Sequence, residues 1–157
     1  KNPGAITILD AVLESPDIDR IELVHLLPPV AKKLLHTFAE PEQGVGTHLP
    51  DCHSTSFSFF SNSLPPRMLD SVGAVANERY VRATKPWQFG DVILIKDAEG
   101  LWVHACNYIA GEIVFTKNGQ SLGRPWVLQT FNEVFASYMQ NSRMQAFFFR
   151  LKPEYRE

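Results

Sequence analysis

Three apolar runs follow one another closely in the middle of the chain, and they limit its fold more than any other feature of the sequence. They are residues 91–96, 101–109 and 112–117. The turn signals Asp97–Gly100 and Ala110-Gly111 separate them, which is the pattern of antiparallel strands joined by hairpins. A further apolar run, Met144–Leu151, predicts a last strand. The sequence therefore predicts an antiparallel sheet in the second half of the chain.

Helical periodicity marks the first third of the chain and one segment near its end. Helical segments are predicted at Ala5–Leu13, at Ile21–Leu27, from Pro29 to about Phe38, and at Thr130–Met139. Pro29 suits the first turn of its helix because a missing N–H costs nothing there. Thr130 and Glu133 have the spacing of a capping box. Helices that precede a meander of antiparallel strands predict an α+β fold.

The length of the chain indicates how many domains it forms, and its charge and apolar content exclude some classes of function. A chain of 157 residues suits one domain, residues 1–157, with a helical part and loop over 1–50 and a core over 51–157. The net charge of -2 gives no basic surface for nucleic acid, and no apolar run approaches the roughly 18 residues that span a bilayer. The first residues lack a signal-peptide pattern. The expected compartment is the periplasm or the exterior if a leader has been removed, and the cytoplasm otherwise.

Residues 51–61 fit two kinds of local structure. Alternation of serine with Thr55, Phe57 and Phe59 favours a strand. Asp51 is nevertheless a good N-cap, and Phe57 with Phe60 fits a helical face. Periodicity alone leaves both structures open.

Cys52 and His104 are the candidates for catalysis. A thiol in the first turn of a helix meets unpaired N–H groups and a dipole that favour the thiolate, and the same N–H groups can hold an oxyanion. His104 lies within a predicted strand, where a titratable side chain needs a partner. Taken alone, each residue is more often structural, as a buried cysteine or a hydrogen-bonded histidine. The histidines show no zinc-site spacing, so a metal site is not expected. Catalysis by a cysteine and a histidine needs no metal, so no cofactor is expected either.

Three motifs, in their order and spacing, resemble the NlpC/P60 family of papain-like cysteine peptidases. They are Asp51-Cys52-His53-Ser54, Gly90-Asp91-Val92-Ile93 and His104-Ala105-Cys106-Asn107-Tyr108-Ile109. The family has D-C-S-G at the start of a helix, G-D-(L/V) opening a strand, and H-V-x-x-Y-(L/I) on the next strand. The resemblance runs from about Phe38 to Leu151 and extends to a divergent bacterial branch of that superfamily. It implies a papain-like fold, with helices packed on the sheet and Cys52 in the first turn of its helix.

The resemblance also implies a role for each site residue. Cys52 is the expected nucleophile and His104 the general base, with a third polar side chain orienting the imidazole. Pairing Ile109 with Glu112 places His104 opposite the end of the 112–117 strand. The candidates for the third position are Thr116, Lys117 and Asn118. Asn118 is the choice because an amide carbonyl accepts from an imidazole N–H, although Asn118 before a glycine also fits a turn.

Three further residues are expected to contact substrate: His53, Lys117 and Trp126. His53 replaces the serine of the family motif and is expected at the cleft wall or in solvent, rather than as a competing base. Core packing also accounts for Trp126, and a solvated surface accounts for Lys117. Cys106 is expected to be buried under the Cys52 helix rather than bonded to Cys52 in a disulfide.

The leading expectation is a cysteine peptidase or amidase that acts through a thioester acyl-enzyme. The resemblance implies a peptide substrate from the cell wall, that is, a peptidoglycan fragment. Two alternatives remain open. One is an acyltransferase or deamidase on the same scaffold, and the other is a non-catalytic binding module that keeps the fold.

Overall fold

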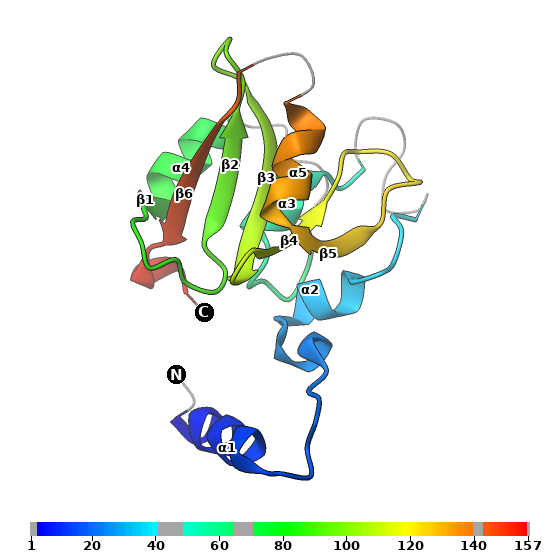
Figure 1. Ribbon diagram of the computed structural model, residues 1–157. Helices are drawn as coiled ribbons and strands as arrows, with labels where there is room; N and C mark the ends of the chain where they lie inside the picture. The colour runs from blue at the N-terminus through cyan, green and yellow to red at the C-terminus, as the bar shows by residue number, and fades with distance from the viewer. Residues whose placement is uncertain (1–2, 41–48, 65–70, 140–142, 157) are drawn as a thin grey trace.

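Six antiparallel strands form one open sheet that carries most of the helices, so the fold class is α+β (Figure 1). The computed structural model describes residues 3–40, 49–64, 71–139 and 143–156. The elements in chain order are α1 (Pro3–Glu14), η1 (Leu23–Leu26), α2 (Pro29–Leu34), α3 (Cys52–Phe57), α4 (Val72–Arg79), β1 (Tyr80–Arg82), β2 (Val92–Lys96), β3 (Trp102–Ala110), β4 (Ile113–Lys117), β5 (Trp126–Thr130), α5 (Phe131–Tyr138), β6 (Gln145–Leu151) and η4 (Pro153–Tyr155). Within these ranges no helix has the length and apolar character needed to cross a membrane.

The strand order is β1-β6-β2-β3-β4-β5. The predicted meander is therefore confirmed for β2 to β4, and β5, which was not predicted from the sequence, continues it by pairing with β4. It is wrong for β6, which lies between β1 and β2. The chain reaches that position because α5 follows β5 directly and leads back across the sheet (Figure 1).

The two faces of the sheet bury different sets of side chains. On one face α5 packs against Ile93, Ile95 and Cys106. On the other face α3 and α4 cover Leu94 and Ala105. Successive residues of a strand point to opposite faces, so β2 is apolar at four consecutive positions because both of its faces are covered.

Residues 51–61 resolve in favour of the helix. Asp51 caps α3, because its Oδ1 accepts the Ser54 N–H at 2.8 Å and the Ser54 Oγ accepts the Asp51 N–H at 3.0 Å. This reciprocal capping box satisfies two backbone donors that would otherwise be unpaired. Local capping outweighs the serine and phenylalanine alternation. The predicted position of Cys52 in the first turn is confirmed.

The expected packing of the N-terminal helices on the sheet is right only in part. Residues of α2 join the core around Trp126, whereas α1 stands apart from the sheet (Figure 1). Ile6, Ile8 and Leu13 of α1 are 66%, 65% and 74% exposed. Apolar spacing correctly predicted a helix here, but the apolar side of that helix has no partner among the described residues.

Candidate functional site

Cys52 is the first residue of α3, and its side chain is buried with 6% exposure. It lines a cavity of about 500 Å³ together with its neighbours Asp51 and His53. The Nδ1 atom of His53 lies 3.6 Å from the Cys52 Sγ. The cavity gives a small substrate a route to a thiol that is otherwise enclosed.

Burial and a neighbouring charge keep the Cys52 thiol protonated. Its pKa is raised to about 12, mainly by removal from water and in smaller part by the Asp51 carboxylate. The backbone N–H groups of Ala105, His53 and Cys52 itself act in the opposite direction, since they favour a negative sulfur. The helix terminus therefore supplies anion-stabilising donors, but burial outweighs them in the free protein.

His104 lies in β3 and is fully buried. The ring of Tyr138, from the last turn of α5, stacks on it with 4.5 Å between ring centroids. The pKa of His104 falls to about 3, mainly because the ring is buried and in smaller part because of the charge of His53. The imidazole is thus neutral at physiological pH, which is the form that can accept a proton.

A chain of hydrogen bonds determines which ring nitrogen of His104 carries the proton. The Asn118 Nδ2 donates to the Gln129 Oε1, so the Asn118 Oδ1 accepts the Thr116 hydroxyl proton at 3.3 Å. Thr116 has then used its one proton, and its Oγ1 accepts from the His104 Nε2 at 2.9 Å. The remaining nitrogen, Nδ1, has no hydrogen-bond partner among the described residues. It is the basic nitrogen of the ring.

The residue that contacts the His104 ring is Thr116 and not Asn118. The predicted pairing of Ile109 with Glu112 is wrong by one residue, because Ala110 pairs with Ile113 across an irregularity in the ladder. Cys106 consequently pairs with Thr116. Thr116 therefore shares a sheet face with Cys106 and His104, and Asn118 acts on the imidazole only through it.

The structure corrects two of the expected substrate contacts. Lys117 is fully buried, and its Nζ donates to the carbonyl oxygens of Gly119, Ser121 and Arg124 at 3.0–3.1 Å. Trp126 is also fully buried, and its Nε1 donates to the Thr55 Oγ1 at 3.0 Å. Neither residue lines the cavity beside Cys52, because both point into the core. His53 does line it.

The cavity is lined by Cys52 but not by the buried His104. It extends from Cys52 on α3 to Tyr138, whose ring stacks on His104. The Ala105 N–H that favours a negative Cys52 sulfur belongs to the residue next to His104 in β3. Cys52 and His104 thus lie near the same end of β3, but no hydrogen bond joins them, since the Cys52 Sγ contacts His53 and the His104 Nδ1 has no partner among the described residues.

Cys106 is close to this site but does not form a disulfide. Both cysteines are free thiols. Cys106 is fully buried as expected, but it packs against the α5 face of the sheet rather than under α3. Burial raises its pKa well above the ordinary value, and the charge of Cys52 raises it further.

Sequence reasoning missed several residues of the site. They are Val72, Trp102, Val103, Gln120, Gln129 and Tyr138. A signal existed for Tyr138, which completes the apolar face of the predicted helix at 130–139. Gln129 gave a weaker signal, as a polar residue in an apolar run.

Among the described residues, no group of His, Cys, Asp and Glu side chains gathers in a way that could hold a metal ion.

Comparison with known proteins assigns no relative to the chain. No family model matches the sequence. No curated protein and no solved structure matches it either.

Proposed function

We propose that the protein is a cysteine hydrolase of the papain-like NlpC/P60 type, in which Cys52 is the nucleophile and His104 the general base. The observation that carries this proposal is the hydrogen-bond chain that leaves the His104 Nδ1 basic and without a partner among the described residues. It is joined by a thiol that lines a cavity from the first turn of a capped helix.

The proposed reaction starts from a neutral thiol and a neutral imidazole. The Cys52 sulfur attacks the carbonyl carbon of an amide while its proton passes to the His104 Nδ1. The free protein has no hydrogen bond between these two groups, so the step requires them to approach each other when substrate is bound. Backbone N–H groups at the start of α3 stabilise the negative oxygen of the tetrahedral intermediate. The tetrahedral intermediate then breaks down: the amine takes the proton from His104 and leaves, and the acyl group stays on the Cys52 sulfur as a thioester. Water then attacks the thioester carbonyl while His104 takes one of its protons. The carboxylic acid is released as the carbon–sulfur bond breaks, and the His104 proton returns to the Cys52 sulfur.

Thr116 and Asn118 act in this proposal by positioning the imidazole. The Thr116 Oγ1 accepts a hydrogen bond from the Nε2–H of His104, so that proton stays on Nε2 when Nδ1 takes a second one. An imidazolium would be unfavourable in so buried a place, since burial holds the pKa of His104 at about 3. We therefore expect the charged form only during the reaction, when the sulfur or the oxyanion carries the opposite charge.

The substrate class comes from the resemblance and from the cavity. The motifs around Cys52 and His104 imply a peptide of the peptidoglycan type. One side of the cavity is apolar, with Val72, Trp102 and Val103, and it suits an uncharged part of such a substrate. Transfer of the acyl group to an amine, or deamidation, would use the same acyl-enzyme.

Burial favours a second candidate, a non-catalytic binding module. Cys52 is 6% exposed and its thiol has a pKa raised to about 12, so the free protein holds very little thiolate. In that case the cavity would bind a ligand with no bond broken.

The two candidates predict different results when Cys52 is changed to alanine. Purified peptidoglycan peptides would be incubated with the wild type and with the Cys52→Ala and Cys106→Ala variants, and new amino termini measured by mass spectrometry. We expect hydrolysis by the wild type and by Cys106→Ala, and none by Cys52→Ala. Equal hydrolysis by Cys52→Ala would contradict the proposal. Peptide binding by all three proteins without cleavage would favour the binding module.

A further inference from the structure

Two adjoining cavities lie at the end of α3 that is opposite to Cys52. Their volumes are about 350 Å³ and 310 Å³, and they share Phe60, Gly90, Leu151 and Arg156 in their walls. None of these residues lines the cavity beside Cys52. The proposed reaction uses neither cavity, so their chemistry has to be explained separately.

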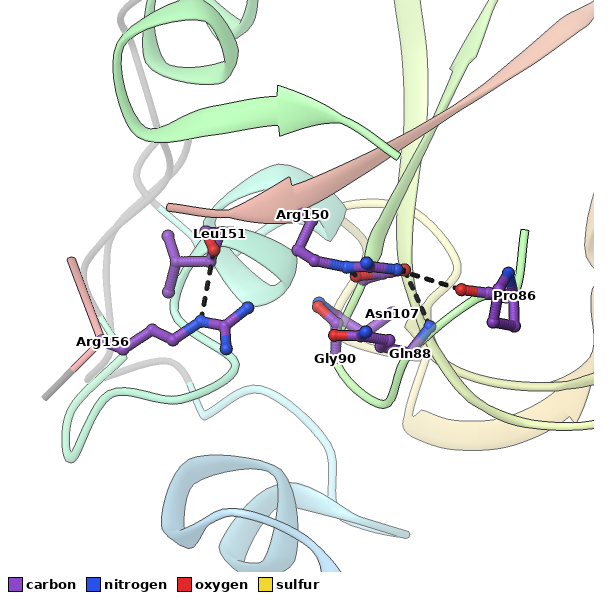
Figure 2. A network of polar contacts seen from close by, with 8 residues as sticks. Pro86, Gln88, Gly90, Asn107, Arg150, Leu151 and Arg156 are labelled. Carbon is purple, nitrogen blue, oxygen red and sulfur yellow. Dashed lines mark hydrogen bonds and ion pairs between the residues drawn. The ribbon is translucent and has the colours of Figure 1, made fainter. Parts of the chain in front are cut away.

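The side chain of Arg156 stands in the shared wall with much of its donor capacity unused. Within the described part of the chain its Nε donates to the Leu151 carbonyl oxygen at 3.2 Å, and its two terminal nitrogens have no partner (Figure 2). A guanidinium offers two parallel N–H groups to a carboxylate. Arg156 is therefore the natural anchor for an anion in these cavities.

Among the described residues that line the cavities, the charges sum to plus one. Arg79 and Arg156 line the first cavity together with one acidic residue, Glu154. Arg150 lines the second, but Asp91 neutralises it through two hydrogen bonds of 2.9 Å and 2.8 Å. A ligand with one negative charge would neutralise this net positive charge.

The floor of the first cavity contains a buried hydroxyl that lacks a partner. Ser56 is 1% exposed, and its Oγ has no hydrogen-bond partner among the described residues. Burial of an unpaired hydroxyl is unfavourable. A polar ligand atom, or a water that a ligand retains, would satisfy it.

An apolar wall adjoins the positive region. Phe60 and Phe89 are 43% and 40% exposed, with their ring centroids 6.3 Å apart, and Pro28 and Pro29 stand beside them. These side chains would cover the uncharged body of a ligand whose anionic group lies at Arg156.

We propose that the two cavities form one binding site for a small carboxylate with an aromatic or aliphatic body. The carboxylate lies between Arg79 and Arg156, and the apolar body rests on Phe60 and Phe89. A free carboxylic acid and the carboxyl end of a short peptide share this chemistry.

Calorimetric titration of the full chain tests the site. The probes are 4-phenylbutyrate, as a free acid, and N-acetylated alanyl-phenylalanine, as a peptide carboxyl end, each beside its uncharged amide. We expect saturable binding of at least one probe, and the probe that binds identifies the source of the ligand. Its amide should bind at least about tenfold more weakly, since a charged hydrogen bond is lost.

The matched variants are Arg156→Met and Arg20→Met, the second in the exposed segment before η1. Arg156→Met should weaken binding at least about tenfold, and Arg20→Met should leave it unchanged. Amide NMR shifts on binding should centre on Gly90 and Leu151. Cys52→Ser should bind as the wild type does, which separates this site from the proposed catalysis. Absence of saturable binding by both probes, equal binding of the amide, no effect of Arg156→Met, or shifts centred elsewhere would each overturn the proposal.

Discussion

At the scale of single residues, the direction of each hydrogen bond around His104 decides what the ring can do. The Thr116 hydroxyl has one proton, which it gives to Asn118, so it can only accept from the imidazole. The opposite tautomer would place two lone pairs against each other inside a fully buried site. Gln129 is part of the same control, because it orients the Asn118 amide.

Replacing Thr116 by valine removes this control with little change in shape. The His104 Nε2–H would then be buried without an acceptor, and we expect the free energy of unfolding in urea to fall by about 1–3 kcal/mol. The ring ¹⁵N shifts should show protonated Nε2 and bare Nδ1 in the wild type, and a mixture of tautomers in Thr116→Val. Thr116→Ser keeps the hydroxyl and should keep both properties. A wild-type ring protonated at Nδ1 would contradict the assignment.

The catalytic candidates also show what a sequence can predict at this scale. The motifs correctly indicated a capped helix that begins at Cys52 and a strand that contains His104. They left Thr116 as one of three candidates and the choice fell wrongly on Asn118, because the β3 to β4 register depends on an irregularity next to the turn. A shift of one residue reverses the face of every side chain. That is why Lys117 points into the core.

At the scale of elements, α3 combines two opposing influences on its first residue. Its N-terminal N–H groups favour a thiolate at Cys52, while its own capping residue, Asp51, adds a negative charge that opposes one. The Asp51 side chain stabilises the start of the helix, but its charge raises the pKa of the Cys52 thiol. An asparagine can cap a helix equally well without the charge.

Asp51→Asn separates the two influences. The cap is retained, so stability should change little, whereas Asp51→Ala should lose about 1 kcal/mol of unfolding free energy. Removal of the carboxylate lowers the pKa of Cys52 below its value of about 12. Iodoacetamide should then alkylate Cys52 roughly three to ten times faster at pH 8, because the thiolate is the reacting form. A slower or unchanged rate would show that the Asp51 charge does not reach the sulfur.

Elements with strong local signals were predictable, and elements defined by the sheet were not. Periodicity and capping correctly indicated α1, α5 and the strands β2 to β4. No local pattern separately indicated β1 or β5, which have three and five residues. Such edge strands form because a neighbouring strand pairs its backbone hydrogen bonds with theirs. The neighbour of β1 is β6, which is distant in the sequence, so no local pattern indicates the pairing.

At the scale of the whole molecule, one ion pair joins the end of the chain to its middle. Arg150 of β6 holds Asp91, the residue before β2, and also donates to the Pro86 carbonyl oxygen at 3.1 Å (Figure 2). Asp91 is 2% exposed, so its carboxylate depends on this partner. The pair lies beside the position where β6 enters between β1 and β2, and it links the sheet across that non-sequential step.

Arg150→Met would leave the Asp91 carboxylate buried without its cation. Breaking one side of a buried pair commonly costs about 3–5 kcal/mol, and we expect a loss of about 3 kcal/mol in urea unfolding because the arginine remains partly exposed. The double variant Asp91→Asn/Arg150→Met carries no unpaired charge and should be more stable than Arg150→Met alone. Arg124→Met, on an exposed turn, should change stability by less than about 0.5 kcal/mol. If the double variant were as unstable as the sum of its single variants, the pair would not be coupled and β6 would be held by its strand pairing alone.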